Sequence, residues 1–228
     1  MRIVFFCSLL ILIGCNKELF TDSGTFTDSR DSLVYKWVSV GNQTWMAQNL
    51  AYLPAVFPPS ESGYQESYYW VSGYEGNSVE AAVSSEIYKQ YGVLYNWKAV
   101  QTACPAGWHL PSDEEWKELE AALGMDPSTP DNSDFQISGA VGEKLKSTSD
   151  WLEEGNGNNY SGLDVLPGGS RNRTGEFGGA GMFATFRTSS ASGSSGNISR
   201  VLSYESVGIS RGSAGHDIGL SARCIKNE

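Results

Sequence analysis

Residues 104–116 read CPAGWHLPSDEEW, and this stretch decides the fold because it fixes where the clearest helix of the chain begins. Ser112 has the N-cap position, and Glu115 three residues later completes a capping box. Gly124 is a natural residue to end the helix. We therefore predict a helix that begins after Ser112 and runs to about residue 123. Its buried face is defined by apolar residues at helical spacing: Trp116, Leu119 and Leu123.

The segments before this helix predict a hairpin and further short elements. Residues 34–50, VYKWVSVGNQTWMAQNL, alternate in polarity on either side of Gly41-Asn42, which is typical of a β-hairpin. Residues 79–90, VEAAVSSEIYKQ, predict one short helix. Residues 54–78 are rich in Pro, Gly and Ser and predict a long loop with a strand fragment at 68–70.

After Asp126 the chain changes character. Short apolar runs alternate with clusters of Gly, Asn and Ser, which predicts a meandering antiparallel sheet with long loops. The runs are residues 163–166, 182–186, 201–204 and 220–225.

The first 15 residues predict export and lipid attachment. After Met1-Arg2, residues 3–13 are almost wholly apolar, but a bilayer span needs roughly 20 such residues. The run has the length of a secretory signal core. Leu12-Ile13-Gly14-Cys15 resembles the lipobox of bacterial lipoproteins, in which the cysteine accepts lipid. An ordinary signal peptide and an uncleaved anchor are the alternatives.

This interpretation divides the chain into three parts. Residues 1–14 are a lipoprotein signal peptide, residues 15–32 a lipidated flexible tether, and residues 33–228 a folded domain. The protein is then exported and lipid-anchored through Cys15 to the cell envelope, with the outer membrane as the expected location. Loss of Arg2 with the leader takes the net charge from −10 to −11. Such an acidic chain repels phosphate backbones, which argues against nucleic acid as a partner.

Two of the four cysteines are left over once Cys7 in the leader and Cys15 are assigned. An exported protein meets an oxidising compartment, so a disulfide between Cys104 and Cys224 is the leading interpretation, with two separate buried thiols as the alternative. It would close a loop of about 120 residues and contribute about 4–5 kcal/mol in the chain-entropy model. A zinc site has little support because no C-x-x-C motif occurs.

Two sets of residues are candidates for ligand binding. A Gly-rich stretch carries hard oxygen ligands that suit calcium, although a solvated acidic loop is the alternative because the spacing does not match an EF-hand. These residues are Asp150, Glu153, Glu154, Asn156, Asn158, Asn159 and Asp164. Tyr68, Tyr69 and Trp70 lie in a loop-rich region and could form an exposed stacking surface for a sugar, with core packing as the alternative. No other cofactor is expected.

Several blocks carry a resemblance to a known family. They are residues 41–50 (GNQTWMAQNL), 91–97 (YGVLYNW), 104–116, 145–151 (LKSTSDW), 166–172 (LPGGSRN) and 221–226 (SARCIK). In this order they resemble the Fibrobacter succinogenes major paralogous domain, over roughly residues 33–227. One departure is visible at Phe183–Ser190, where the family often has paired tryptophans followed by serines.

The resemblance implies an α+β fold related to the C-type-lectin-like fold, which formylglycine-generating enzymes also use. Two main helices would pack on an irregular, loop-rich antiparallel sheet. Cys104 and Cys224 would then lie on elements that touch. Trp45, Trp97, Trp108 and Trp116 occupy the family blocks and are expected in the core.

The expected function is that of a non-catalytic binding or display module at a membrane surface, with a glycan or a partner protein as ligand. A structural or adhesion protein of the envelope is the alternative. An oxidase-like enzyme related to formylglycine generation is a weaker one, because it needs reactive thiols. His109 is expected to be structural and His216 solvated. The oligomeric state is left open.

Overall fold

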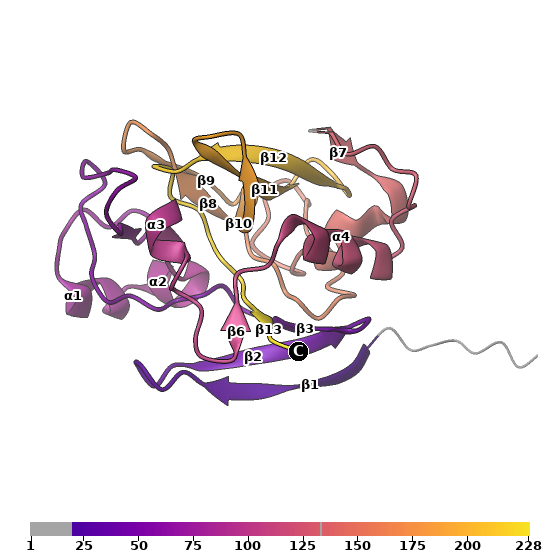
Figure 1. Ribbon diagram of the computed structural model, residues 1–228, viewed down its shortest axis with the longest axis horizontal. Helices are drawn as coiled ribbons and strands as arrows, with labels where there is room; N and C mark the ends of the chain where they lie inside the picture. The colour runs from indigo at the N-terminus through magenta and orange to yellow at the C-terminus, as the bar shows by residue number, and fades with distance from the viewer. Residues whose placement is uncertain (1–19, 133) are drawn as a thin grey trace, which may run out of the picture.

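The computed structural model describes residues 20–132 and 134–228, in which β-strands form three sheets (Figure 1). The five-stranded sheet has the order β1-β2-β3-β13-β6, the six-stranded sheet the order β7-β12-β11-β10-β8-β9, and β4 pairs with β5. The strands are β1 Phe20–Thr27, β2 Val34–Val40, β3 Gln43–Met46, β4 Tyr69–Trp70, β5 Leu94–Tyr95, β6 Trp108–His109, β7 Phe135–Gln136, β8 Gly168–Arg171, β9 Phe177–Ala180, β10 Phe183–Ser192, β11 Gly196–Ser203, β12 Ile209–Gly215 and β13 Ile225–Lys226.

The helices are short. The described residues contain α1 Val79–Ser84, α2 Glu86–Tyr91, α3 Trp97–Val100, α4 Asp113–Ala122 and α5 Val141–Leu145, with a 3₁₀ turn η1 at Ser138–Ala140. Among the helices of the described residues only α4, with 10 residues, approaches three turns. Nowhere in these described ranges is there a helix with the length and apolar character that a membrane crossing requires.

The predicted fold class, C-type-lectin-like with two main helices packed on a sheet, is therefore wrong, since strands predominate and α4 alone is a substantial helix. The helix predicted over residues 79–90 is broken at Ser85, whose backbone is extended at φ −72° and ψ 146°. The Ser85 hydroxyl accepts a hydrogen bond from the Tyr88 amide, so this residue ends α1 and caps α2.

Strand β1 lies in the segment for which the sequence predicts a flexible tether. It pairs antiparallel with β2 from Phe20 opposite Val40 to Thr27 opposite Val34. The Phe26 ring stacks on Trp108, with 4.5 Å between ring centroids, and this contact fixes the strand against the domain. The tether prediction therefore does not hold for residues 20–27, which form a paired strand outside the predicted domain of residues 33–228. The signal peptide and Cys15 lie outside the described residues.

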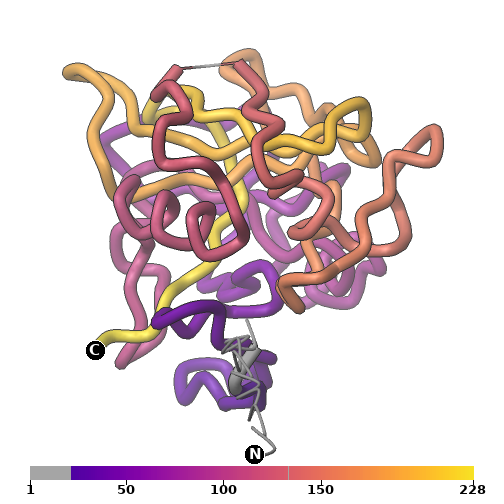
Figure 2. The backbone as a smooth tube through the Cα atoms, turned by 90° about the vertical axis from the view of Figure 1, so that its right-hand side faces the viewer, coloured from indigo at the N-terminus to yellow at the C-terminus, as the bar shows by residue number. Residues whose placement is uncertain are grey.

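The two larger sheets face each other across the molecule. Seen from the side, the β1–β2 hairpin lies at one end and strands β11 and β12 at the other (Figure 2). The predicted hairpin is confirmed as β2–β3, and Gly41 has the positive φ of 62° that its turn requires. Strand β13 inserts between β3 and β6, which joins the C-terminal end of the chain to both.

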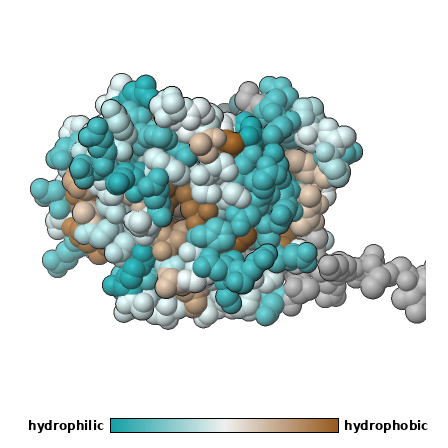
Figure 3. All heavy atoms as spheres, in the orientation of Figure 1, coloured by the Kyte–Doolittle hydropathy of each residue, from teal (hydrophilic) through white to brown (hydrophobic). Residues whose placement is uncertain are grey.

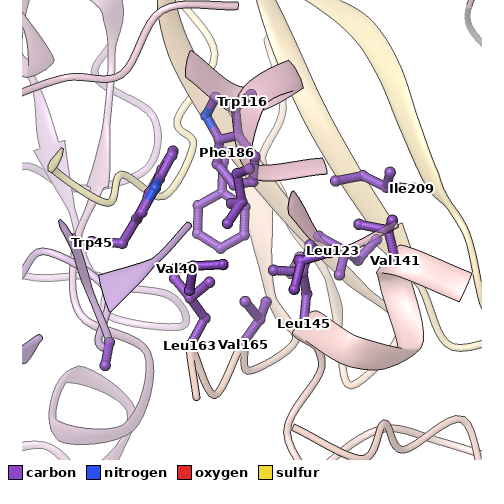
Figure 4. Packing of buried hydrophobic residues seen from close by; sticks show 14 of the residues in the cluster. Val40, Trp45, Trp116, Leu123, Val141, Leu145, Leu163, Val165, Phe186 and Ile209 are labelled. Atoms are coloured by element: carbon purple, nitrogen blue, oxygen red, sulfur yellow. The ribbon is translucent and has the colours of Figure 1, made fainter. Parts of the chain in front are cut away.

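The first core cluster connects α4 to both large sheets. Trp45 of β3 packs edge-on against Trp116 of α4 at 5.0 Å between centroids, and Trp116 meets Phe186 of β10 at 5.6 Å (Figure 4). Leu145 and Val165 pack in the same cluster. A second cluster lies under α1–α3 and includes Met46, Leu50, Val93, Tyr95 and Ala222. The core prediction is thus confirmed for Trp45 and Trp116, whereas Trp97 and Trp108 are partly buried beside the second cluster.

The disulfide between Cys104 and Cys224 is confirmed. It ties the segment after α3 to the residue that precedes β13. Because the two cysteines are 120 residues apart, the bond closes a long loop of the unfolded chain.

We expect the double variant Cys104→Ser/Cys224→Ser to lose about 2–5 kcal/mol of unfolding free energy, because the unfolded chain regains the entropy of the open loop. Urea unfolding of wild type and variant, with reduced wild type as control, measures this loss. An unchanged unfolding midpoint, or two alkylatable thiols in the native wild type, contradicts the expectation.

Candidate functional site

The aromatic residues predicted to form a stacking surface do not form one. Trp70 is fully buried, and its indole N–H donates to the Glu61 carbonyl. The Arg171 guanidinium lies 4.5 Å from the Trp70 ring centroid, and Tyr68 stacks parallel to the ring at 5.7 Å. Trp70 is therefore a core residue, while Tyr68 and Tyr69 are half-buried beside it.

The residues proposed as calcium ligands are spread along the turns of their loop. The side-chain oxygens of Asn156, Asn158 and Asn159 accept hydrogen bonds from backbone amides of the same loop. Asp150 accepts one from Gln90 on α2. Glu153, Glu154 and Asp164 have positive φ angles that turn the chain. In residues 20–132 and 134–228 no three His, Cys, Asp or Glu side chains are grouped so that they could hold a metal ion.

Both histidines contact neighbouring elements. The two ring nitrogens of His109 lie 2.7 Å from Glu115 Oε1 and 2.7 Å from Asn227 Oδ1. His109 therefore links β6, α4 and the C-terminal residues, in agreement with a structural role. His216 stacks on Trp97 at 5.7 Å between centroids, so it is not simply solvated.

Buried arginines are the feature that the sequence did not predict. Arg171, Arg187, Arg200 and Arg223 are among the largest fully buried side chains. Three of them donate to main-chain carbonyls of loops or of a strand end: Arg171 to Pro59 and Asp217, Arg187 to Gly215 at the end of β12 and to Ile218, and Arg223 to Leu163 and Asp164. Burial lowers the pKa of Arg187 to about 10 and that of Arg223 to about 9. These guanidinium groups hold the long loops on the sheets.

Arg200 differs because it binds carboxylates. From β11 its Nη1 lies 2.7 Å from Asp113 Oδ1, and its Nε lies 2.5 Å from Glu120 Oε1. Asp113 also pairs with Arg211 of β12 at 2.9 Å. Arg200 and Arg211 are direct cross-strand neighbours, an arrangement that is unfavourable for like charges unless an anion lies between them. Asp113 supplies that anion.

The helix positions of these acids follow from the sequence. Asp113 is the first residue of α4, and the confirmed capping box of Ser112 and Glu115 fixes where the helix begins. Glu120 follows seven residues later, so the two carboxylates lie on one face of the helix. That face also carries Trp116, the residue predicted to be buried. Asp113 and Glu120 lie on the same face of α4 as the apolar residue Trp116. Two acidic residues on a face predicted to be buried were the sequence signal that could have indicated buried arginine partners.

A cavity of about 280 Å³ lies beside this ion-pair network, between α4, the 125–132 loop and β12. We call it the α4 pocket. Its charged lining residues are Lys117, Glu120, Asp126, Asp131, Arg200 and Arg211, and its apolar ones include Met125, Pro127, Pro130 and Ile209. Small-ligand sites in proteins commonly combine an apolar lining with a few convergent polar groups, as this cavity does.

The two acids of the network have opposite pKa shifts. Burial alone would raise the pKa of Asp113, but hydrogen bonds and charges from Arg211 and Arg200 outweigh it and lower the pKa to about 2. Burial raises the pKa of Glu120 above its usual value, because the single partner Arg200 does not offset the loss of water. Within the described part of the chain, no hydrogen bond reaches Glu120 Oε2, and this side chain lines the pocket. Perturbed pKa values of this kind are common at functional sites.

Comparison with known proteins places the chain in a family. The family model of the Fibrobacter succinogenes major domain matches residues 38–226. The chain belongs to the Fibrobacter succinogenes major domain family. No curated protein and no solved structure gave a match.

The family match covers the parts of the molecule that build the candidate site. Within this Fibrobacter succinogenes major domain lie α4, β11, β12 and both cysteines of the disulfide. Strand β1 precedes the matched residues and adds an edge strand to the domain. The α4 pocket is thus formed entirely by elements of the domain itself.

We expect Asp113→Asn to destabilise the protein at neutral pH by about 3–5 kcal/mol, because it leaves Arg200 buried with one partner fewer. The pKa of Asp113 is lower in the folded state, so its stabilising effect is present above about pH 4 and is lost as the pH falls toward 2. Urea unfolding at neutral and acidic pH should show the difference between wild type and variant shrinking with acidification. A constant difference across this range contradicts the prediction.

Proposed function

We propose that the protein is a lipid-anchored binding module of the bacterial envelope, and that its α4 pocket holds one unit of a glycan. The proposal is for a binding role rather than a catalytic one. A sugar ring presents hydroxyl groups at its edge and C–H groups on its faces. The carboxylates of the pocket, Lys117 and Arg211 can form hydrogen bonds with the hydroxyl groups. Met125, Pro127 and Ile209 can pack against the C–H faces. Its volume is near the lower end of the range for ligand pockets, about 300–1,000 Å³, which suits a single small ligand.

The observation that carries this proposal is the state of Glu120. Only 7 % of its side chain is exposed, and Glu120 lines the pocket. Arg200 holds one carboxylate oxygen, whereas the other has no hydrogen bond from the described residues. Glu120 Oε2 is not among the fully buried polar atoms that lack a hydrogen bond, so solvent reaches it and it is open to a hydrogen-bond partner. A ligand donor at this oxygen would provide that partner.

We expect Glu120→Gln to weaken binding of a glycan ligand at least about tenfold, because a hydrogen bond to a charged group contributes about 1.5–3 kcal/mol. A glycan array identifies the ligand, and calorimetric titration measures the affinity. Glu118→Gln is the matched control, since Glu118 lies on the same helix but is exposed and pairs with Gln43. Equal affinities of wild type and Glu120→Gln would place the ligand elsewhere.

The lipid anchor is the second part of the proposal, and it rests on the sequence Leu12-Ile13-Gly14-Cys15. If Cys15 carries the lipid, strand β1 begins only five residues later. Five residues span at most about 18 Å, so the domain would stay close to the membrane surface.

We expect wild type to enter the detergent phase on phase partitioning and Cys15→Ala to stay in the aqueous phase, because lipid on Cys15 supplies the membrane affinity. Mass spectrometry of the mature N-terminus is the accompanying measurement. Identical partitioning of both proteins into the aqueous phase contradicts the lipoprotein assignment.

A protein partner, with an adhesion or structural role in the envelope, is the second candidate function. Phe135, Ile137 and Val207 are exposed apolar side chains, and they lie on or next to β7, an edge strand of the six-stranded sheet. Elsewhere hydrophilic residues predominate on the face that Figure 3 shows, with hydrophobic ones gathered in small areas. Cross-linking that captures a protein through this edge, together with no binding to any glycan, would favour this role.

A further inference from the structure

The ion pairs beside the α4 pocket share three cations among four carboxylates. Lys117 Nζ lies 2.9 Å from Asp131, 3.2 Å from Glu114 and 3.4 Å from Asp113. Arg211 is shared between Asp113 and Asp131. Arg200 is shared between Asp113 and Glu120. Three cations therefore serve four carboxylates.

The cation contacts are distributed unevenly, and among the buried carboxylates Glu120 has the fewest. Asp113 contacts three cations and Asp131 two. Glu114 contacts only Lys117, but its side chain is 76 % exposed, so water solvates it. Glu120 also contacts one cation, yet only 7 % of its side chain is exposed. A buried carboxylate with incomplete pairing is energetically unfavourable, and it favours a further cation at the free oxygen.

We propose that the α4 pocket recognises an amino sugar, whose protonated amine pairs with Glu120 Oε2. This inference rests on the proposed function, since it uses the same pocket and narrows its ligand. An ammonium group carries three donors and one positive charge, so it can give Glu120 both a hydrogen bond at Oε2 and a second cationic partner.

The rest of the pocket is compatible with this class of ligand. Asp131 and Asp126 at the rim add negative charge that attracts an amine. Lys117 and Arg211 keep their own carboxylate partners, which reduces their repulsion of the incoming cation. The raised pKa of Glu120 points in the same direction, because it reports that the site disfavours an unpaired negative charge. Binding of an ammonium removes that penalty.

Titration of three soluble probes tests the inference: methyl glucosaminide, methyl glucoside and methyl N-acetylglucosaminide, at about pH 6.5, where an amine is protonated. Wild type should bind the amine at least about tenfold more tightly than either neutral sugar, the usual effect of a charge-assisted contact. Glu120→Gln, shown to be folded by circular dichroism and thermal unfolding, should lose this preference. Glu118→Gln should retain it.

The outcomes separate this inference from the proposed function. Equal binding of all three sugars to wild type, or a preference that survives in Glu120→Gln, overturns the amine inference and leaves a glycan site in place. Cyclohexylamine is the probe without a sugar. If it binds in a Glu120-dependent way while no sugar binds, the ammonium site stands and the glycan function fails. No binding of any probe to the folded wild type contradicts both.

Discussion

The ion pairs of Arg200 hold α4 on the six-stranded sheet. One guanidinium on β11 bridges the first and the last turn of α4, and so fixes the only substantial helix of the described residues on the six-stranded sheet. The same face of α4 carries Trp116 against Trp45 and Phe186, which joins the helix to both sheets. Because the same ion pairs line the α4 pocket, the stability of the fold and the chemistry of the candidate site depend on one set of charges.

Buried guanidinium groups also replace much of the apolar packing that the long loops lack. Such a loop has few hydrophobic side chains to bury, but it has carbonyl groups that need donors. Arg171 and Arg223 each bind carbonyls of loops that are distant in the sequence. Each guanidinium has five N–H donors in a rigid plane, so one side chain can satisfy several carbonyls at once. The Gly- and Ser-rich sequence after α4 is thereby held in a defined conformation.

Local signals in the sequence were sufficient for the beginning of α4 and for the β2–β3 hairpin. The disulfide was predicted by elimination, because Cys104 and Cys224 are the two cysteines left once Cys7 and Cys15 are assigned. The capping box acts within four residues, and the hairpin depends on Gly41 and its neighbours. The contacts that sequence reasoning missed are non-local. Asp113 meets a partner 87 residues away, and the burial of Trp70 depends on Arg171, which arrives from β8. The sequence of strand β1 predicted a tether because its composition is polar. Its strand conformation depends on pairing with β2 and on the stacking of Phe26 on Trp108, neither of which is visible in the local sequence.

The covalent bond between Cys104 and Cys224 has a consequence for cleavage of the chain by a protease. Exposed turns such as residues 126–132 and 193–195 lie between the two cysteines and are natural sites of cleavage. A cut in either turn opens the backbone without releasing a fragment, since both pieces remain joined through the sulfur atoms. Arg200 and α4 would then still meet after a cut at residues 193–195, and the nicked protein would stay assembled until a reductant reached it.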